Sequence, residues 1–119
     1  MARVTGIGGI FFRARDPQAL ADWYQRHLGI TQPDTTVWMQ EAGPTVFSPF
    51  RADSDYFAAD KQWMLNLRVD DLPGLILRLR AEGIAVETRA DWDGDGSYGW
   101  FARIHDPEGT SIELWQPPA

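Results

Sequence analysis

The 119-residue chain is long enough for one domain and contains no cysteine, which excludes disulfides, thiolate metal sites and cysteine nucleophiles. Its formal net charge of −6 argues against nucleic-acid binding, because that function depends on clustered basic residues. The first residues lack the apolar stretch of a secretory signal, and no apolar run approaches the ~20 residues of a membrane span. We therefore expect a cytoplasmic protein with neither a nucleic-acid nor a membrane partner.

The chain contains an internal repeat. Residues 4–30 and 60–86 each place a strand pattern before a helix that opens with Asp, and Arg13 and Asp16 match Arg68 and Asp71 at the same spacing. A strand pattern that runs into a proline also ends both halves. We therefore predict a single domain, residues 1–119, made of two modules at about 1–58 and 60–119.

The first module begins with a strand in which Ile10, Phe12 and Ala14 alternate with a mixed face formed by Gly9, Phe11 and Arg13. A helix follows, with Asp16 as N-cap, Pro17 at its first position and Gly29 at its end. Its apolar stripe is formed by Leu20, Trp23, Tyr24 and Leu28. Short strands are expected at about 35–41 and 45–49, before an irregular polar linker at 50–61.

The second module repeats this order. Its first strand has an apolar face formed by Trp63, Leu65, Leu67 and Val69. Its other face is mixed and is formed by Met64, Asn66 and Arg68. The helix begins after Asp71, is weakened in its first turn by Gly74 and ends at Gly83. Strands are expected at about 84–89, 99–105 and 111–116, the last two joined by a tight turn at 105–110.

The duplicated plan and three motifs, RxRDPxxLxxWYxxxLGI, RVDDLPGLILRLRAEGI and DPEGTSIELWQP, resemble the vicinal-oxygen-chelate superfamily. This superfamily includes glyoxalase I, extradiol dioxygenases, fosfomycin-resistance enzymes and bleomycin-binding proteins. The resemblance implies an α+β fold in which tandem βαβββ modules form a curved mixed sheet that cups a ligand. It also implies a homodimer, commonly with the site shared between the two copies.

The resemblance also indicates where a metal would be held. Metal-using relatives place His, Glu or Gln on the first strand of each module and Glu on the last strand. The matching positions here are Gly9, Met64, Phe47 and Glu113, and one carboxylate is too few for a divalent ion. We therefore expect no metal and no other cofactor, and we interpret His27 and His105 as surface residues.

Glu113 is the candidate catalytic residue. It lies between Ile112 and Leu114, so strand alternation points it away from the core, as a polar anchor or a general base. The alternative is a salt bridge with Arg13, Arg68 or Arg103. The candidate ligand-binding residues are Phe11, Arg13, Trp38, Phe47, Met64, Asn66, Arg68, Arg103 and Trp115.

Two further features have competing interpretations. The segment DWDGDG at 91–96 matches the start of a calcium loop, but position twelve is Ala102 instead of Glu, which favours a flexible acidic loop. Among six tryptophans, Trp38 and Trp115 are assigned to the cup, whereas Trp23, Trp63 and Trp100 are assigned to packing.

Three functions remain open at this stage. The first is a small-molecule-binding protein of the glyoxalase/bleomycin-resistance type, with a small organic ligand and no catalytic metal. The second is a metal-independent lyase or isomerase that uses Glu113 as base. The third is a glyoxalase-like metalloenzyme, which the missing ligands disfavour.

Overall fold

The computed structural model describes residues 2–31 and 36–119. Its helices are α1 (Pro17–Leu28), α2 (Leu72–Ala81) and the short α3 (Ala90–Asp93), and its strands are β1 (Leu65–Arg68), β2 (Trp100–His105) and β3 (Ser111–Gln116). The expected α+β class is confirmed. In the part of the chain that is described, no helix is long and apolar enough to cross a membrane.

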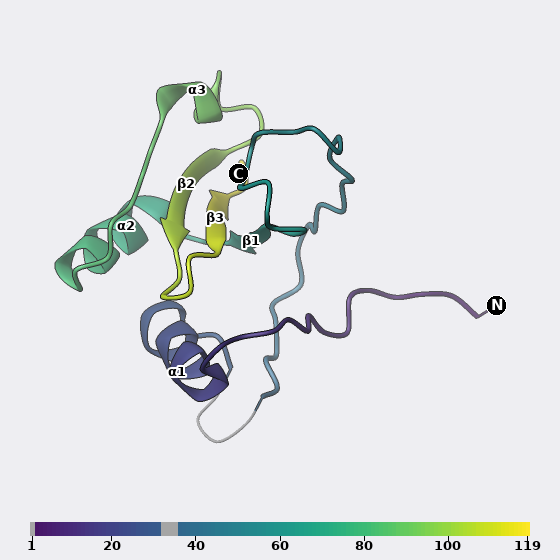
Figure 1. The fold of residues 1–119 in the computed structure, drawn as a ribbon. Helices are drawn as coiled ribbons and strands as arrows, with labels where there is room; N and C mark the ends of the chain where they lie inside the picture. The colour runs from purple at the N-terminus through teal and green to yellow at the C-terminus, as the bar shows by residue number, and fades with distance from the viewer. Residues whose placement is uncertain (1, 32–35) are drawn as a thin grey trace.

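The three strands form one mixed sheet with β3 in the middle (Figure 1). β1 runs parallel to β3, and β2 runs antiparallel to it. The register places Asn66 and Arg103 on either side of Glu113, so these three residues form one row across the sheet. The next row with the same orientation contains Arg68, Trp115 and Phe101.

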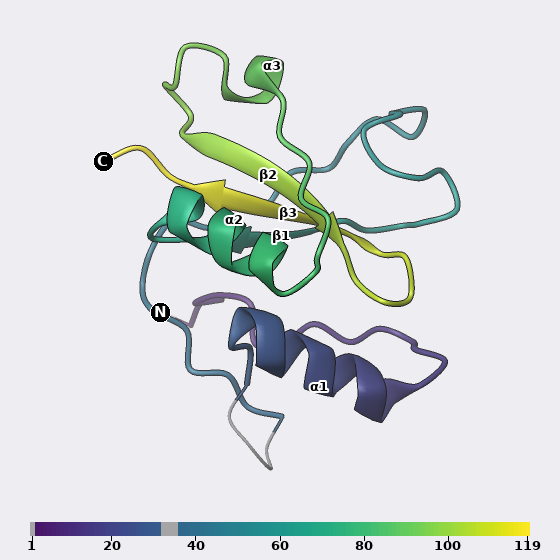
Figure 2. The same ribbon diagram turned by 90° about the vertical axis from the view of Figure 1, so that its left-hand side faces the viewer.

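Strand alternation divides the sheet into a core face and a polar face. Ile104, Ile112 and Leu114 are completely buried and pack in one cluster with Leu72 and Leu79 of α2. α2 lies across this face, whereas residues 50–61 lie on the opposite side of the sheet (Figures 1 and 2). The predicted orientation, with Ile112 and Leu114 beneath a helix, is therefore confirmed.

Both long helices begin at the predicted Asp caps. The Asp16 carboxylate accepts a hydrogen bond from the Ala19 amide at 3.1 Å, and the Asp71 carboxylate accepts one from the Gly74 amide at 3.1 Å. A Cβ atom at position 74 would lie 2.3 Å from an Asp71 carboxylate oxygen. Gly74, which is expected from the sequence to weaken this turn, therefore also leaves the space that the Asp71 side chain needs to cap the helix.

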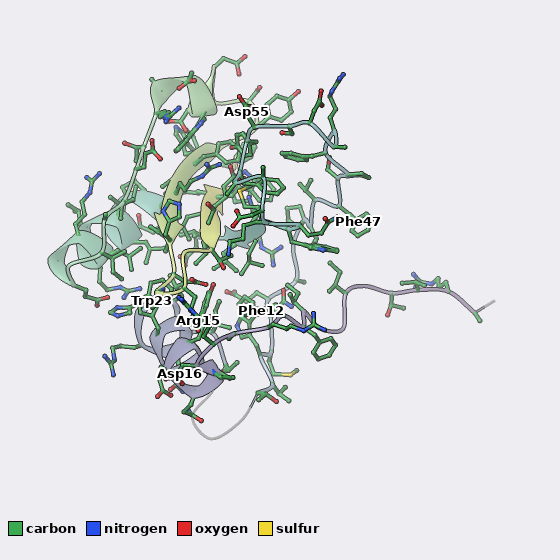
Figure 3. The ribbon with its side chains drawn as sticks, in the orientation of Figure 1. Phe12, Arg15, Asp16, Trp23, Phe47 and Asp55 are labelled. Atoms are coloured by element: carbon green, nitrogen blue, oxygen red, sulfur yellow. The ribbon has the colours of Figure 1, made fainter. Side chains whose placement is uncertain are left out.

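The predicted turn between β2 and β3 fastens α1 to the second module. Asp106, 4% exposed, accepts a 2.7 Å hydrogen bond from the Tyr24 hydroxyl and also binds the amides of Glu108 and Thr110. The Glu108 carboxylate accepts hydrogen bonds from the amides of Arg15 and Asp16, at the start of α1 (Figure 3). This connects the helix of the first module to the sheet of the second.

The strands predicted for the first module are not formed in the described residues. Residues 2–15 run away from the sheet in irregular conformation (Figure 1), and residues 36–50 contain no strand. The predicted strand at 35–41 also begins at a position outside the described residues. Alternation fixes which side chains share a face, but a strand forms only where a neighbouring strand satisfies its backbone groups, so alternation alone does not predict a strand.

Two predictions for the second module also need correction. The strand expected at 84–89 is reduced to an isolated bridge between Glu87 and Arg103, after which the chain turns into α3. Trp63, assigned to the core, is 74% exposed because β1 begins only at Leu65. Trp23 does pack against the core cluster, as expected.

Candidate functional site

A cavity of about 500 Å³ lies between the linker and the polar face of the sheet. Arg103 and His105 of β2 and Ser111 of β3 line it from the sheet, and residues 53–59 line it from the linker. Its lining residues are Asp53, Ser54, Asp55, Tyr56, Phe57, Ala58, Ala59, Arg103, His105 and Ser111.

Glu113 is located under this linker, in the middle of the sheet, and is only 9% exposed. The side-chain amide of Asn66 donates a 2.7 Å hydrogen bond to Oε1, and the Tyr56 hydroxyl donates a short hydrogen bond to Oε2. No arginine in the described chain lies within ion-pair distance of Glu113, so the alternative interpretation as a salt-bridge partner is wrong for this structure. Both carboxylate oxygens are instead satisfied by neutral donors.

Tyr56 closes the site from the linker side. Burial and the hydrogen bond to Glu113 raise the pKa of Tyr56 to about 12, so the phenol is protonated and donates its hydrogen at neutral pH. The ring also lies under the Arg103 guanidinium, whose Cζ is 4.7 Å from the ring centroid. Tyr56 therefore contacts two of the sheet's polar residues at once.

Arg103 lies between two aromatic rings. Its Cζ atom is 4.7 Å from the Tyr56 centroid and 5.3 Å from that of Trp92, which belongs to α3. Its Nη2 atom is 3.6 Å from the sulfur of Met64. Its buried Nε atom has no hydrogen-bond partner in the described structure. The cation is thus stabilised mainly by ring faces rather than by a carboxylate.

The neighbouring row of the polar face has mainly structural contacts. Trp115 stacks on Phe101 with a centroid distance of 6.5 Å, and its indole nitrogen donates a 2.7 Å hydrogen bond to the Tyr98 carbonyl. Arg68 donates hydrogen bonds to the carbonyls of Glu41 and Pro44, both at 2.6 Å. This arginine therefore ties residues 41–44 to the sheet.

Arg103 is the sequence-predicted residue that lines the cavity, and four of the others are exposed and take no part in the contacts around Glu113. Phe11 is 96% exposed. Phe47 is 80% exposed, and Figure 3 shows it pointing away from the sheet. Arg13 is exposed as well, and Trp38 is 41% exposed. All four belong to segments in which the predicted strands are not formed. The structure therefore brings together Met64, Asn66, Arg103 and Glu113 from the predicted set, but leaves these four apart.

Sequence reasoning missed Tyr56 and Trp92, which contact the two sides of Arg103. Both residues lie in segments interpreted as irregular connections, where no periodicity gives a facing direction. One signal was present in the linker. Phe50 packs on both Tyr56 and Phe57, with centroid distances of 5.7 and 5.8 Å, and such an aromatic concentration is unusual for a solvated linker.

The two histidines differ from each other. His105 is exposed, as expected, with Nε2 at 3.2 Å from the Ser111 hydroxyl. His27 is half-buried, with its side chain 13% exposed, and its Nδ1 atom lies 2.8 Å from the Glu82 carboxylate at the end of α2. The hydrogen bond from His27 lowers the pKa of Glu82. Neither histidine is near Glu113 in a metal-binding arrangement.

The donors around Glu113 do not fit a divalent metal. Across residues 2–31 and 36–119, no three His, Asp or Glu side chains converge at one point. In the acidic segment, Asp93 accepts a hydrogen bond from the Phe101 amide, and Asp95 accepts one from the Ser97 amide. These carboxylates stabilise the connection between α3 and β2 through backbone contacts.

Comparisons with known proteins agree with this architecture. No curated protein matches the chain. One solved structure that does match is TnmS3, an antibiotic binding protein from Streptomyces sp. CB03234, with 22% sequence identity and a TM-score of 0.60 over 99% of this chain and 100% of that one. At this identity the similarity concerns the fold. A family model described as a glyoxalase-like domain matches residues 9–115. The expected family is confirmed: the chain belongs to the glyoxalase-like domain family, and its α+β fold is of the glyoxalase type.

Proposed function

We propose that this protein binds a small organic molecule on the polar face of its sheet, without a catalytic metal. The observation that supports this most strongly is the row of Asn66, Glu113 and Arg103 beside a cavity of about 500 Å³. A cavity of this size suits a small ligand, and a few convergent polar groups among aromatic side chains are typical of such sites.

The donor set supports binding without metal. Of the four positions at which metal-using relatives carry ligands, Gly9, Phe47 and Met64 offer no suitable oxygen or nitrogen, and only Glu113 does. Its carboxylate already accepts hydrogen bonds from Asn66 and Tyr56. A bound ion would have to replace these donors while gaining a single protein carboxylate.

A binding or sequestering role is favoured over catalysis by Glu113. Each Glu113 oxygen already accepts one hydrogen bond, from Asn66 or from Tyr56, and this arrangement suits a polar anchor for a ligand. The solved relative of the same fold is described as an antibiotic-binding protein, which supports the same choice.

We also propose that the protein is a homodimer. The irregular segments of the first module expose several large apolar side chains, among them Val4, Phe11, Met39 and Phe47, each at least 78% exposed. Exposed apolar residues concentrated in one part of a chain favour covering by another chain. A second copy would cover these side chains and place Phe11, Arg13, Trp38 and Phe47 near a site. The two-module division and the cytoplasmic location stay predictions.

Native mass spectrometry with elemental analysis tests the binding proposal. Protein purified without chelator is expected to carry nickel, zinc, iron and manganese well below one equivalent per chain, and to release a small organic ligand on denaturation. One tightly held metal equivalent per chain would contradict the proposal and favour a glyoxalase-like metalloenzyme.

Light scattering at micromolar concentration tests the dimer. The mass of two chains is expected, since one chain has a mass of 13.5 kDa and leaves its apolar segments uncovered. A single 13.5 kDa species at all concentrations would contradict the dimer and would leave the site within one chain.

A further inference from the structure

Tyr56 belongs to the linker at residues 50–61 and not to the sheet, and its side chain extends from the linker to Glu113. Its segment is held to the polar face by few polar contacts. The other hydrogen bonds that residues 50–61 make in the described structure are local, such as those from the Ser54 amide to the Arg51 carbonyl and from the Lys61 amide to the Ala58 carbonyl. The Tyr56 side chain crosses to the sheet, where its hydroxyl donates a hydrogen bond to Glu113 and its ring contacts the Arg103 guanidinium. Displacing this side chain would therefore break the hydrogen bond to Glu113 and the ring contact with Arg103.

The surroundings of Tyr56 specify what can replace it. The Glu113 carboxylate accepts hydrogen bonds and cannot donate them, so the replacing group needs a donor at this point. Asn66 holds the other carboxylate oxygen and thereby fixes the orientation of the carboxylate. The requirement at this end of the site is for one hydroxyl-type donor.

Arg103 specifies the shape of the same group. Its guanidinium faces the Tyr56 ring at 4.7 Å, while Trp92 supports the other side at 5.3 Å. Trp92 would stay in place if Tyr56 left, and Arg103 would then present a flat cationic face toward the cavity. Such a face prefers an aromatic ring over an aliphatic chain. A ligand carboxylate at the donor position would be repelled by Glu113.

Resting on the proposed function, we infer that the ligand is a neutral planar hydroxyaryl compound that takes the place of Tyr56. Its phenolic hydroxyl donates to Glu113, and its ring stacks on Arg103. Tyr56 is then a built-in competitor. Because the resident ring must leave first, the apparent affinity of the chain is lower than that of the open site, in proportion to the fraction of open molecules.

The test uses 2-naphthol as probe and 2-methoxynaphthalene as its matched control, which keeps the rings but has no hydroxyl hydrogen to donate. Binding is followed by the probe's own fluorescence, for the unmodified protein and for Tyr56→Ala. The control variant is Tyr98→Ala, which removes a tyrosine that is 79% exposed. Thermal melting establishes that each variant is folded.

Tyr56→Ala is expected to bind 2-naphthol at least tenfold more tightly than the unmodified protein does, and at least tenfold more tightly than it binds 2-methoxynaphthalene. Tyr98→Ala should behave as the unmodified protein. In Tyr56→Ala, the further change Glu113→Leu should abolish the preference for 2-naphthol. Equal affinities of Tyr56→Ala for the two probes, or no gain over the unmodified protein, would overturn the inference.

Different results would contradict the hydroxyaryl inference and the proposed binding site. If Tyr56→Ala shows no preference for the hydroxyl while the ligand released from the purified protein still binds beside Glu113, the hydroxyaryl inference is wrong and the binding function stands. If that ligand binds away from Glu113 and Arg103, the proposed site is wrong, and the hydroxyaryl inference is overturned with it.

Discussion

Replacing Tyr24 with Phe tests whether the β2–β3 turn holds α1 in place. Tyr24 is 7% exposed and Asp106 is 4% exposed, and the hydroxyl of the first donates a 2.7 Å hydrogen bond to the carboxylate of the second. Tyr24→Phe keeps the ring and removes only the donor, so one buried carboxylate oxygen loses its partner. Burial, together with the Asp106 carboxylate, raises the pKa of Tyr24, which keeps the phenol protonated as donor at neutral pH.

The expected cost is about 2 kcal/mol, since a hydrogen bond to a charged group contributes roughly 1.5–3 kcal/mol and Asp106 keeps its two backbone donors. For a domain of this size the loss corresponds to a fall in Tm of roughly 6–12 °C. Urea unfolding followed by circular dichroism gives the free energy, with Tyr98→Phe as the exposed control. A Tyr24→Phe cost below about 0.5 kcal/mol would show that this hydrogen bond does not hold α1 in place.

Three further predictions concern the sheet and its linker. Leu114→Gln should lower the free energy of unfolding by at least ~3 kcal/mol, because Leu114 is fully buried. Glu113→Gln should keep a cooperative thermal melt but weaken ligand binding about tenfold. The reverse pattern would mean that Glu113 faces the core and Leu114 faces the ligand. The difference in tyrosinate absorbance between the unmodified protein and Tyr56→Phe should have its midpoint near pH 12, because the pKa of Tyr56 is raised to about 12. The stability that the Tyr56 hydroxyl contributes is therefore complete below about pH 10 and is lost as the pH rises toward 12. A midpoint near pH 10 would contradict the hydrogen bond to Glu113. Gly99→Ala should lower the free energy of urea unfolding by at least ~1 kcal/mol more than Gly109→Ala does. Both glycines have positive φ, but a Cβ atom at position 99 would lie 2.1 Å from the Gln116 carbonyl oxygen, whereas one at position 109 would meet no atom of the described chain within 4 Å. Equal losses would contradict the close approach at Gly99.

The parts of the fold that depend on local chemistry could be predicted from the sequence. Asp16 and Asp71, each followed closely by proline, mark the starts of α1 and α2, and these caps form as predicted. Alternation along 111–116 places Glu113 opposite Leu114, and the structure has the same facing. Such features depend on side chains a few positions apart, which a sequence displays directly.

The remaining features depend on contacts between distant segments. Alternation at 8–14 and 36–49 indicates which side chains share a face, but it does not supply a neighbouring strand, and no strand is formed at these residues. The bond between Tyr24 and Asp106 joins two modules, and that between Tyr56 and Glu113 joins an irregular linker to a strand. Neither linker nor turn has a periodicity that could indicate such partners.

Nuclear magnetic resonance of the isotope-labelled protein tests most directly whether the copurifying ligand binds on the polar face of the sheet. Adding this ligand to ligand-free protein is expected to shift the side-chain signals of Asn66 and Arg103 and the backbone signals of residues 53–59 and of Glu113. Signals of α2, on the other face of the sheet, should stay in place. Shifts concentrated on α2 or along α1, with Asn66 and Arg103 unchanged, would contradict a binding site on the polar face.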